Sequence, residues 1–256
     1  MIFIIPIAAL AASFLTFFSG FGLGTILMPV FIIFFPIDTA IALTAIVHFL
    51  NNILKVSLLW KEAKWKVVMK FGLPAFLMAF FGAKLLFFLE KIEPLYIYQI
   101  LGKTMEISAL KIVIAVLLLL FLVLETFPKF KDISFPEKVL PFGGALSGFF
   151  GGLSGHQGAL RSMFLLKAGL SKEGYIATGV IVAAMVDVSR ISVYWNNIIQ
   201  SDYESHLLIM FLAVIFAFAG VFIGRKTLKK IKMQTIQTII GIMLFAIAVL
   251  LGTGII

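Results

Sequence analysis

A run of glycines and polar residues, "GGLSGHQGAL", occupies residues 151–160 of an otherwise strongly apolar chain, and Arg161 follows it directly. His156, Gln157 and Arg161 can donate hydrogen bonds to an anion, and Arg161 adds a fixed positive charge. The glycines would allow a helix to break, and a break frees the N–H groups of a helix N-terminus, which favour anions. The stretch therefore predicts an anion site at a depth where polar groups are costly.

A second glycine run, "SGFGLG" at residues 19–24, interrupts another long apolar segment. Backbone that leaves a helix within hydrocarbon must line a cavity or be buried in protein, because unpaired amides and carbonyls are costly there. We therefore expect the two runs to meet near the middle of the membrane as a two-sided anion cradle. Close helix packing is the alternative explanation for such small residues. The predicted backbone members of the cradle are Gly22, Gly24, Gly155 and Gly158.

Polar residues recur at helical spacing along the apolar segment 39–60. Spacings of three and four residues place side chains on one face of a helix. The members of this stripe are Thr44, His48, Asn51, Asn52 and Lys55. Such a stripe predicts a cavity or a polar partner. Hydrogen bonds to neighbouring helices would also explain His48 and Asn52, and Lys55 could extend to the cytoplasmic edge.

Asp187, Arg190 and Tyr194 share a face of the segment 173–195 in the same way. One interpretation is an ion pair between Asp187 and Arg190 that neutralises both charges. The other makes Arg190 a ligand for a substrate, with Asp187 as its partner or as a proton acceptor. A proton-driven carrier needs a group whose charge changes in use. The candidates are Asp187, His48 and His156, and the sequence does not rank them.

The composition indicates a membrane protein. The chain has 256 residues, of which 62% are hydrophobic and 13% charged, against about 25% charged in a typical soluble domain. No cysteine, phosphate-binding loop or metal-ligand spacing is present, so we expect no cofactor and no metal. We predict an all-α integral membrane protein, a polytopic helical bundle in one membrane domain, 1–256. The predicted apolar segments are 2–35, 39–60, 67–89, 107–127, 138–168, 173–195, 206–224 and 234–254.

These segments divide into two similar halves, 1–127 and 138–254. A shift of 134 residues places Gly24 on Gly158, as well as Thr44 on Thr178 and Trp60 on Tyr194. Each half begins with a segment of more than 30 residues that contains glycines, and three plain segments follow it. Such repeats are common in secondary transporters.

Basic residues suggest that the halves face opposite ways. Lysines at 61–66 and five basic residues at 225–232 predict cytoplasmic loops, whereas 196–205 has no basic residue and should lie outside. Corresponding segments of the two halves are four segments apart, so with simple crossings they would point in the same direction. They can point in opposite directions only if each long segment enters and leaves the membrane on the same side. We therefore predict an inverted repeat in which both glycine-broken segments are re-entrant or hairpin-like, with arms of roughly 14 residues each.

The chain resembles the sulfite exporter TauE/SafE family. The resemblance lies in "GFGLGTILMP" at 20–29 with "TAIVHFLNN" at 44–52, and in "GGLSGHQGALRSMFL" at 151–165 with "ATGVIVAAMVD" at 177–187. It implies a bacterial or archaeal membrane carrier of small anions, chiefly sulfur oxyanions and organosulfonates. The second run departs from the plainer glycine pattern of the family by carrying His156, Gln157 and Arg161.

We predict a secondary transporter, not an enzyme, that moves a small anion such as sulfite across the cell (inner) membrane, with proton coupling left open. Arg161 and Arg190 would supply charge, and the polar side chains of both halves would complete the pocket. The predicted partners are the anion and the lipid bilayer, with no nucleic acid, and homo-oligomerisation stays open. The alternatives are an intramembrane serine protease of the rhomboid type that uses Ser154 and His206, and a passive anion channel.

Overall fold

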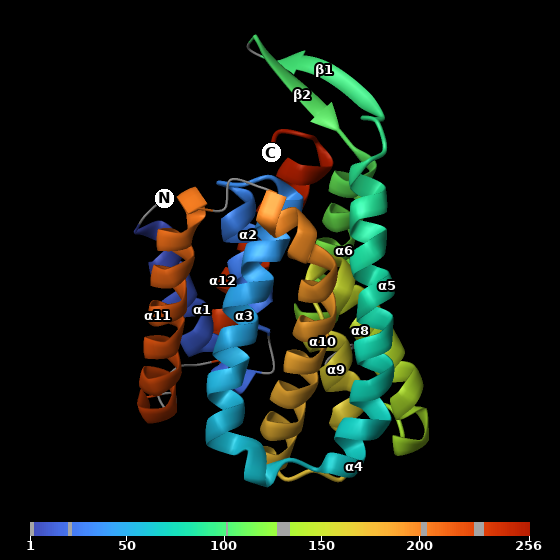
Figure 1. Cartoon of the computed structure of the whole chain (residues 1–256), viewed down its shortest axis with the longest axis vertical. Coiled ribbons are helices and arrows are strands. Elements are labelled where there is room, and N and C mark those ends of the chain that lie inside the picture. Colours follow the sequence, from blue (N-terminus) through green and yellow to red (C-terminus); the bar gives the residue numbers. More distant parts are fainter. Residues whose placement is uncertain (1–2, 20–21, 101, 127–133, 201–203, 228–232) are drawn as a thin grey trace.

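Apolar stretches fold as helices in this chain because a helix pairs its own backbone polar groups, as a membrane requires. The computed structural model is a bundle of helices with one β-hairpin at its upper end (Figure 1). It describes the chain apart from residues 1–2, 20–21, 101, 127–133, 201–203 and 228–232. Within that part, four helices are long and apolar enough to cross a membrane. These four stretches correspond to α3 (Ile37–Leu59), α5 (Leu73–Glu90), α10 (Lys172–Gln200) and α11 (Glu204–Thr227).

The first apolar segment is broken at its glycines, as predicted. α1 (Ile4–Ser19) is followed by α2 (Leu23–Ile32), which packs beside α1. The chain then reaches α3 at the upper end of the bundle, the end at which α1 begins (Figure 1). α1 and α2 therefore form a helical hairpin, and Gly22, where α2 begins, is buried.

The fifth segment is broken in the same way. α8 (Leu140–Ser154) ends at Gly155, which has a positive φ of 78°, and α9 (Gly158–Leu165) follows. The N–H of Phe135, just before α8, donates to the carbonyl of Met163 near the end of α9 at 3.0 Å. The rings of Phe135 and Phe164 stack with centroids 4.5 Å apart. α9 therefore returns to the lower end of the bundle, where α8 begins (Figure 1).

The arms of the two hairpins are unequal, so the expected length of roughly 14 residues for every arm was wrong. The first arms, α1 and α8, have 16 and 15 residues, whereas the second arms, α2 and α9, have 10 and 8. The second arms are short because non-helical backbone at 33–36 and 166–171 links each of them to the next long helix.

Each hairpin packs closely on a helix of the other half. α8 lies along α5, and α1 lies along α11. A Cβ on Gly148 of α8 would come within 2.0 Å of the carbonyl oxygen of Ala75, and one on Gly152 equally close to that of Ala79. On the other side, a Cβ on Gly220 of α11 would lie 2.4 Å from the carbonyl oxygen of Leu10 in α1. Small residues permit this backbone contact between membrane helices.

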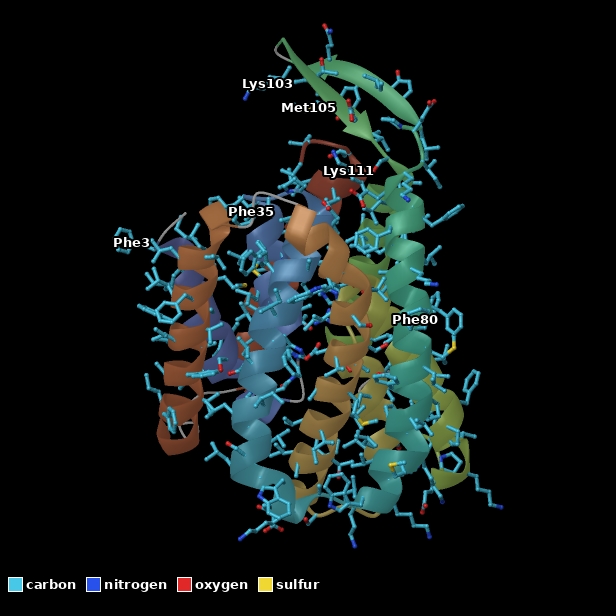
Figure 2. The ribbon with its side chains drawn as sticks, in the orientation of Figure 1. Phe3, Phe35, Phe80, Lys103, Met105 and Lys111 are labelled. Atoms are coloured by element: carbon cyan, nitrogen blue, oxygen red, sulfur yellow. The ribbon has the colours of Figure 1, made fainter. Side chains whose placement is uncertain are left out.

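The segment between α5 and α6 contains a β-hairpin that the sequence analysis did not predict. β1 (Tyr96–Ile100) pairs antiparallel with β2 (Lys103–Ile107), and Gly102 near the turn has a φ of 74°. The rings of Tyr96 and Tyr98 stack on one face. Alternating aromatic and β-branched residues favour strands, and this short pattern lies between two strongly apolar helices. Lys103 and Met105 project with the hairpin beyond the helices (Figure 2).

The remaining helices complete the bundle. The last helix of each half is α6 (Ala109–Thr126) or α12 (Met233–Gly252), and the two pack against each other. The short elements are a 3-10 turn at Trp60–Glu62, α4 (Trp65–Val67), a π-helical turn at Val68–Gly72 and a 3-10 turn at Glu137–Val139.

The outward faces of the helices are apolar, as a lipid-facing surface requires. Phe80 points away from the bundle on α5 (Figure 2), and Phe81 beside it is 56% exposed. The ammonium of Lys84 lies 4.5 Å from the centre of the Phe80 ring, a favourable cation–π arrangement for a charge at such a surface. Trp60, Trp65 and Trp195 are about half exposed.

We expect Gly148→Ala to destabilise the protein, because the new methyl group would collide with the backbone of α5. Overpacking of this kind typically costs about 1–3 kcal/mol. Gly252→Ala is the matched control, since a Cβ there meets only Ala115 at an ordinary 3.5 Å. Thermal denaturation of the detergent-purified variants is the measurement. Equal melting temperatures for Gly148→Ala and wild type would contradict the close contact.

Candidate functional site

The polar stripe of α3 faces the interior of the bundle. Its five residues, Thr44, His48, Asn51, Asn52 and Lys55, are each at most 5% exposed. Opposite them on α10, Asp187, Arg190 and Tyr194 are fully buried. α3 and α10 pack directly against each other, so the two predicted polar faces meet, one from each half of the chain.

The carboxylate of Asp187 joins these faces. Its Oδ2 accepts a hydrogen bond from Nδ1 of His48 at 2.7 Å and one from Nδ2 of Asn52 at 3.0 Å. Its Oδ1 accepts from Nε of Arg190 at 3.0 Å, and Nη2 of Arg190 approaches the same oxygen to 2.7 Å. A buried ionised carboxylate is tolerated only when it is paired and hydrogen-bonded. Asp187 meets this condition by using donors from both halves.

Arg190 extends from this pair to the tip of the second hairpin. Its Nη1 donates to the carbonyl of Gly151 at 3.4 Å. A Cβ on Gly155 would lie only 2.8 Å from Nη1, and the left-handed backbone at this residue also favours glycine. Glycine at position 155 therefore allows α8 to end here and also lets the guanidinium of Arg190 approach the backbone closely. The ion pair that the sequence analysis considered is confirmed, and the guanidinium is already engaged by protein groups.

The tips of the two hairpins meet beside this network. A Cβ on Gly24 would lie 3.3 Å from the carbonyl oxygen of Gly155, and one on Gly22 would lie 3.9 Å from Nε2 of His48. The helices α2 and α9 both begin here, after Gly22 and Gln157, and neither N-terminus has a side-chain cap among the described residues. Both N-termini direct positive partial charge into the same region.

Several buried polar atoms on α3, on α10 and in the second hairpin have no protein hydrogen-bond partner within the described part of the chain. They are Thr44 Oγ1, Asn51 Nδ2, His156 Nε2, both amide atoms of Gln157, Arg161 Nη1 and Ser189 Oγ. Buried polar groups are nearly always hydrogen-bonded in native proteins, and leaving one unpaired costs about 1–3 kcal/mol. Such a set, most of it donors, suits a ligand rich in acceptor oxygens.

Arg161 lies apart from the Asp187 network. Its Nε lies 3.4 Å from the position that a Cβ on Gly179 would take, so the side chain runs between α9 and α10. Its charge is close enough to Asp187 and to Lys55 to interact with both electrostatically. Arg161 therefore adds a positive charge near the pair without being neutralised by a direct carboxylate contact among the described residues.

His156 is held away from the carboxylate. Its ring stacks on Phe121 of α6 with centroids 5.7 Å apart, and its Nδ1 lies 3.0 Å from the carbonyl oxygen of Ser154. Its Nε2 is one of the unpartnered atoms. Of the two buried histidines predicted as proton-coupling candidates, His48 is the one that contacts Asp187.

Three hydrogen bonds were missed by the sequence analysis, because each involves a serine. Ser13 of α1 donates to Oδ1 of Asn51 at 3.0 Å. Ser147 of α8 donates to the carbonyl of Gln157 at 3.2 Å, and the hydroxyl of Tyr175 donates to Ser162 at 2.7 Å. Serines are common on membrane helices, so no spacing distinguished these in advance.

Within the described residues, no contact pairs Ser154 with a histidine base as the protease alternative requires. The hydroxyl of Ser154 donates to the carbonyl of Phe150 at 3.1 Å, a local helical hydrogen bond. The side chain of His206 lies outside the described residues.

The helical bundle, its apolar exterior and its buried charged residues are those of a membrane-embedded protein. The chain belongs to the sulfite exporter TauE/SafE family, whose pattern matches residues 5–251. This is a family of membrane transporters and not of enzymes. No curated protein and no solved structure matches the chain.

We expect Asp187→Asn to destabilise the protein strongly, by about 3–5 kcal/mol, because Arg190 would keep a buried charge without its counter-ion. The double variant Asp187→Asn/Arg190→Met should recover much of the loss, since it removes both charges. Glu137→Gln is the control, because it breaks only the exposed Lys70–Glu137 pair and should cost about 0–1 kcal/mol. Thermal unfolding in detergent is the measurement. A double variant no more stable than the single one would contradict the pairing argument.

Proposed function

We propose that this protein is a secondary transporter of a small sulfur-containing anion, a sulfur oxyanion such as sulfite or an organosulfonate, in the cell membrane. The observation that carries the proposal is the meeting of two helix N-termini among buried donors. Within the described residues, neither terminus has a side-chain cap and these donors have no protein partner. A tetrahedral or pyramidal oxyanion offers several acceptor oxygens to such a set. Helix N-termini and a nearby guanidinium both favour negative charge.

In this proposal the ligand set is drawn from both hairpins and both polar faces. Gln157 and Arg161 would contact the anion from the second hairpin, together with the first amides of α9 from Gly158 onward, and His156 would border the site. The amides after Gly22 and the side chains of Thr44 and Asn51 would contact it from the first half. His48 and Asn52 border the same region through the Asp187 network. Arg190 would act through its position against Gly155 rather than as an unpaired cation.

We also propose that residues 1–127 and 138–254 form an inverted repeat. The exchange of partners supports this: the hairpin of each half packs on the other half, α1 on α11 and α8 on α5. The two hairpins start at opposite ends of the bundle (Figure 1). One half would then rock against the other while the hairpin tips stay in place. This movement would expose the site to each side of the membrane in turn. A passive channel would not need such a paired arrangement.

We expect Arg161→Ala to weaken anion binding roughly ten- to a hundredfold, as loss of a charged hydrogen bond does. The fold should persist, because Arg161 has no described carboxylate contact to leave unpaired. Lys84→Ala is the control, since it removes an exposed positive charge on the outer face of α5. The measurement is thermal shift of the purified protein with sulfite, sulfate, thiosulfate, sulfoacetate and taurine, followed by flux in proteoliposomes. Unchanged binding in Arg161→Ala would count against this site.

We expect the β-hairpin end to face outward and the end with Trp60–Glu62 to face the cytoplasm. The chain contains no cysteine, so single cysteines can be introduced cleanly. Lys103→Cys should react with an impermeant thiol reagent added to intact cells, and Lys61→Cys should react only after the membrane is opened. The reverse pattern would contradict the proposed orientation and, with it, the charge-based assignment of the two halves.

A further inference from the structure

The two ring nitrogens of His48 face different surroundings. Nδ1 lies 2.7 Å from Oδ2 of Asp187. Nε2 faces the start of α2, 3.9 Å from the position that a Cβ on Gly22 would take. The residue is only 3% exposed. The imidazole therefore lies between the buried carboxylate and the start of α2.

The carboxylate determines which nitrogen of a neutral His48 carries the hydrogen. An ionised carboxylate can only accept hydrogen bonds, and Asp187 already accepts from Arg190 and Asn52. The hydrogen in the short contact must therefore lie on Nδ1. Neutral imidazole then has a lone pair on Nε2, and a lone pair aimed at the tip of α2 repels an anion there.

Protonation reverses this. Nε2 becomes a donor, and the positive charge of the ring is balanced by Asp187 on its other side. The same tip offers the first amides of α2 and the unpartnered hydroxyl of Thr44, one turn before His48. Thr44 is 1% exposed, and its methyl group lies 3.8 Å from the Cβ position of Gly24. A protonated His48 therefore adds a donor beside the start of α2.

We propose that His48 takes up a proton when the anion binds at the tip of α2, so that the protein carries a proton together with each anion. The inference rests on the anion-transport function proposed above. Proton and anion then cross the membrane in the same direction. A dianion accompanied by one proton still carries net negative charge, so an inside-negative membrane potential favours its export.

The other charged and titratable groups near His48 are less suited to this role. Arg190 is tied to Asp187, and a guanidinium such as that of Arg161 keeps its proton in a protein. Lys55 lies seven residues beyond His48 on α3, about two helical turns away. Tyr194 donates its hydroxyl to the carbonyl of Gly152. His156 faces Phe121 and a neutral carbonyl, so no described carboxylate balances a proton on its ring. These differences single out His48.

The test is calorimetric binding of sulfate to the purified protein in pairs of buffers with different ionisation enthalpies. Sulfate stays fully ionised between about pH 5 and 8, the range in which histidine titrates, so any proton taken up belongs to the protein. We expect about one proton per anion at the upper end of this range, where a free histidine is mostly neutral. In the same region, the affinity should fall about tenfold for each pH unit.

Three variants separate coupling from structure. His48→Gln places an amide N–H near the position of Nε2 that needs no proton, so binding should persist with almost no proton uptake. His48→Asn keeps a donor to Asp187 but lacks any group near Gly22, so binding should weaken, again without proton uptake. It also serves if His48→Gln does not fold. His156→Gln should retain the proton count of the wild type, even if its affinity falls.

Binding without proton uptake in the wild type would overturn the inference and leave the transport function standing. An unchanged proton count in His48→Gln or His48→Asn would do the same. If none of the sulfur anions binds, the proposed function itself fails, and the inference fails with it.

Discussion

The carboxylate of Asp187 is the interaction on which the rest of the structure depends. It is fully buried and accepts hydrogen bonds from Arg190 on its own helix and from His48 and Asn52 across the interface. In a low-dielectric interior, each of these charges would be prohibitively costly alone. Together they hold α3 and α10 in one relative position, and they place His48 and Arg190 against the tips of the two hairpins.

The glycines make this arrangement geometrically accessible. Gly144, Gly148 and Gly152 recur every four residues along α8 and allow its backbone to contact carbonyl groups of α5 and of the π-helical turn before it. Gly155 then ends the helix beside Arg190, and Gly24 lets the opposite tip reach the carbonyl of Gly155. Close backbone packing and the unsatisfied helix ends thus arise from the same residues. Packing and anion binding, which the sequence analysis treated as competing explanations, are compatible: glycines of α8 pack, and those at the tips border the site.

The sequence predicted the helical segments and their breaks well, because long apolar runs and glycine clusters are strong local signals. It also predicted the buried faces of α3 and α10, since polar residues at helical spacing in an apolar segment are costly in contact with lipid. It could not choose between His48 and His156, because only the fold shows which ring meets Asp187 and which stacks on Phe121. The β-hairpin escaped prediction because its alternating pattern covers only five residues per strand.

The central claim is that an oxyanion binds where the two broken helices meet. Selenate is a close analogue of sulfate, and selenium can be located by anomalous diffraction from crystals soaked in it. The account predicts one selenium peak between the start of α2, near His48, and the start of α9, near Gln157. A peak on the outer surface of the helices, or at either end of the bundle with none between the tips, would contradict it.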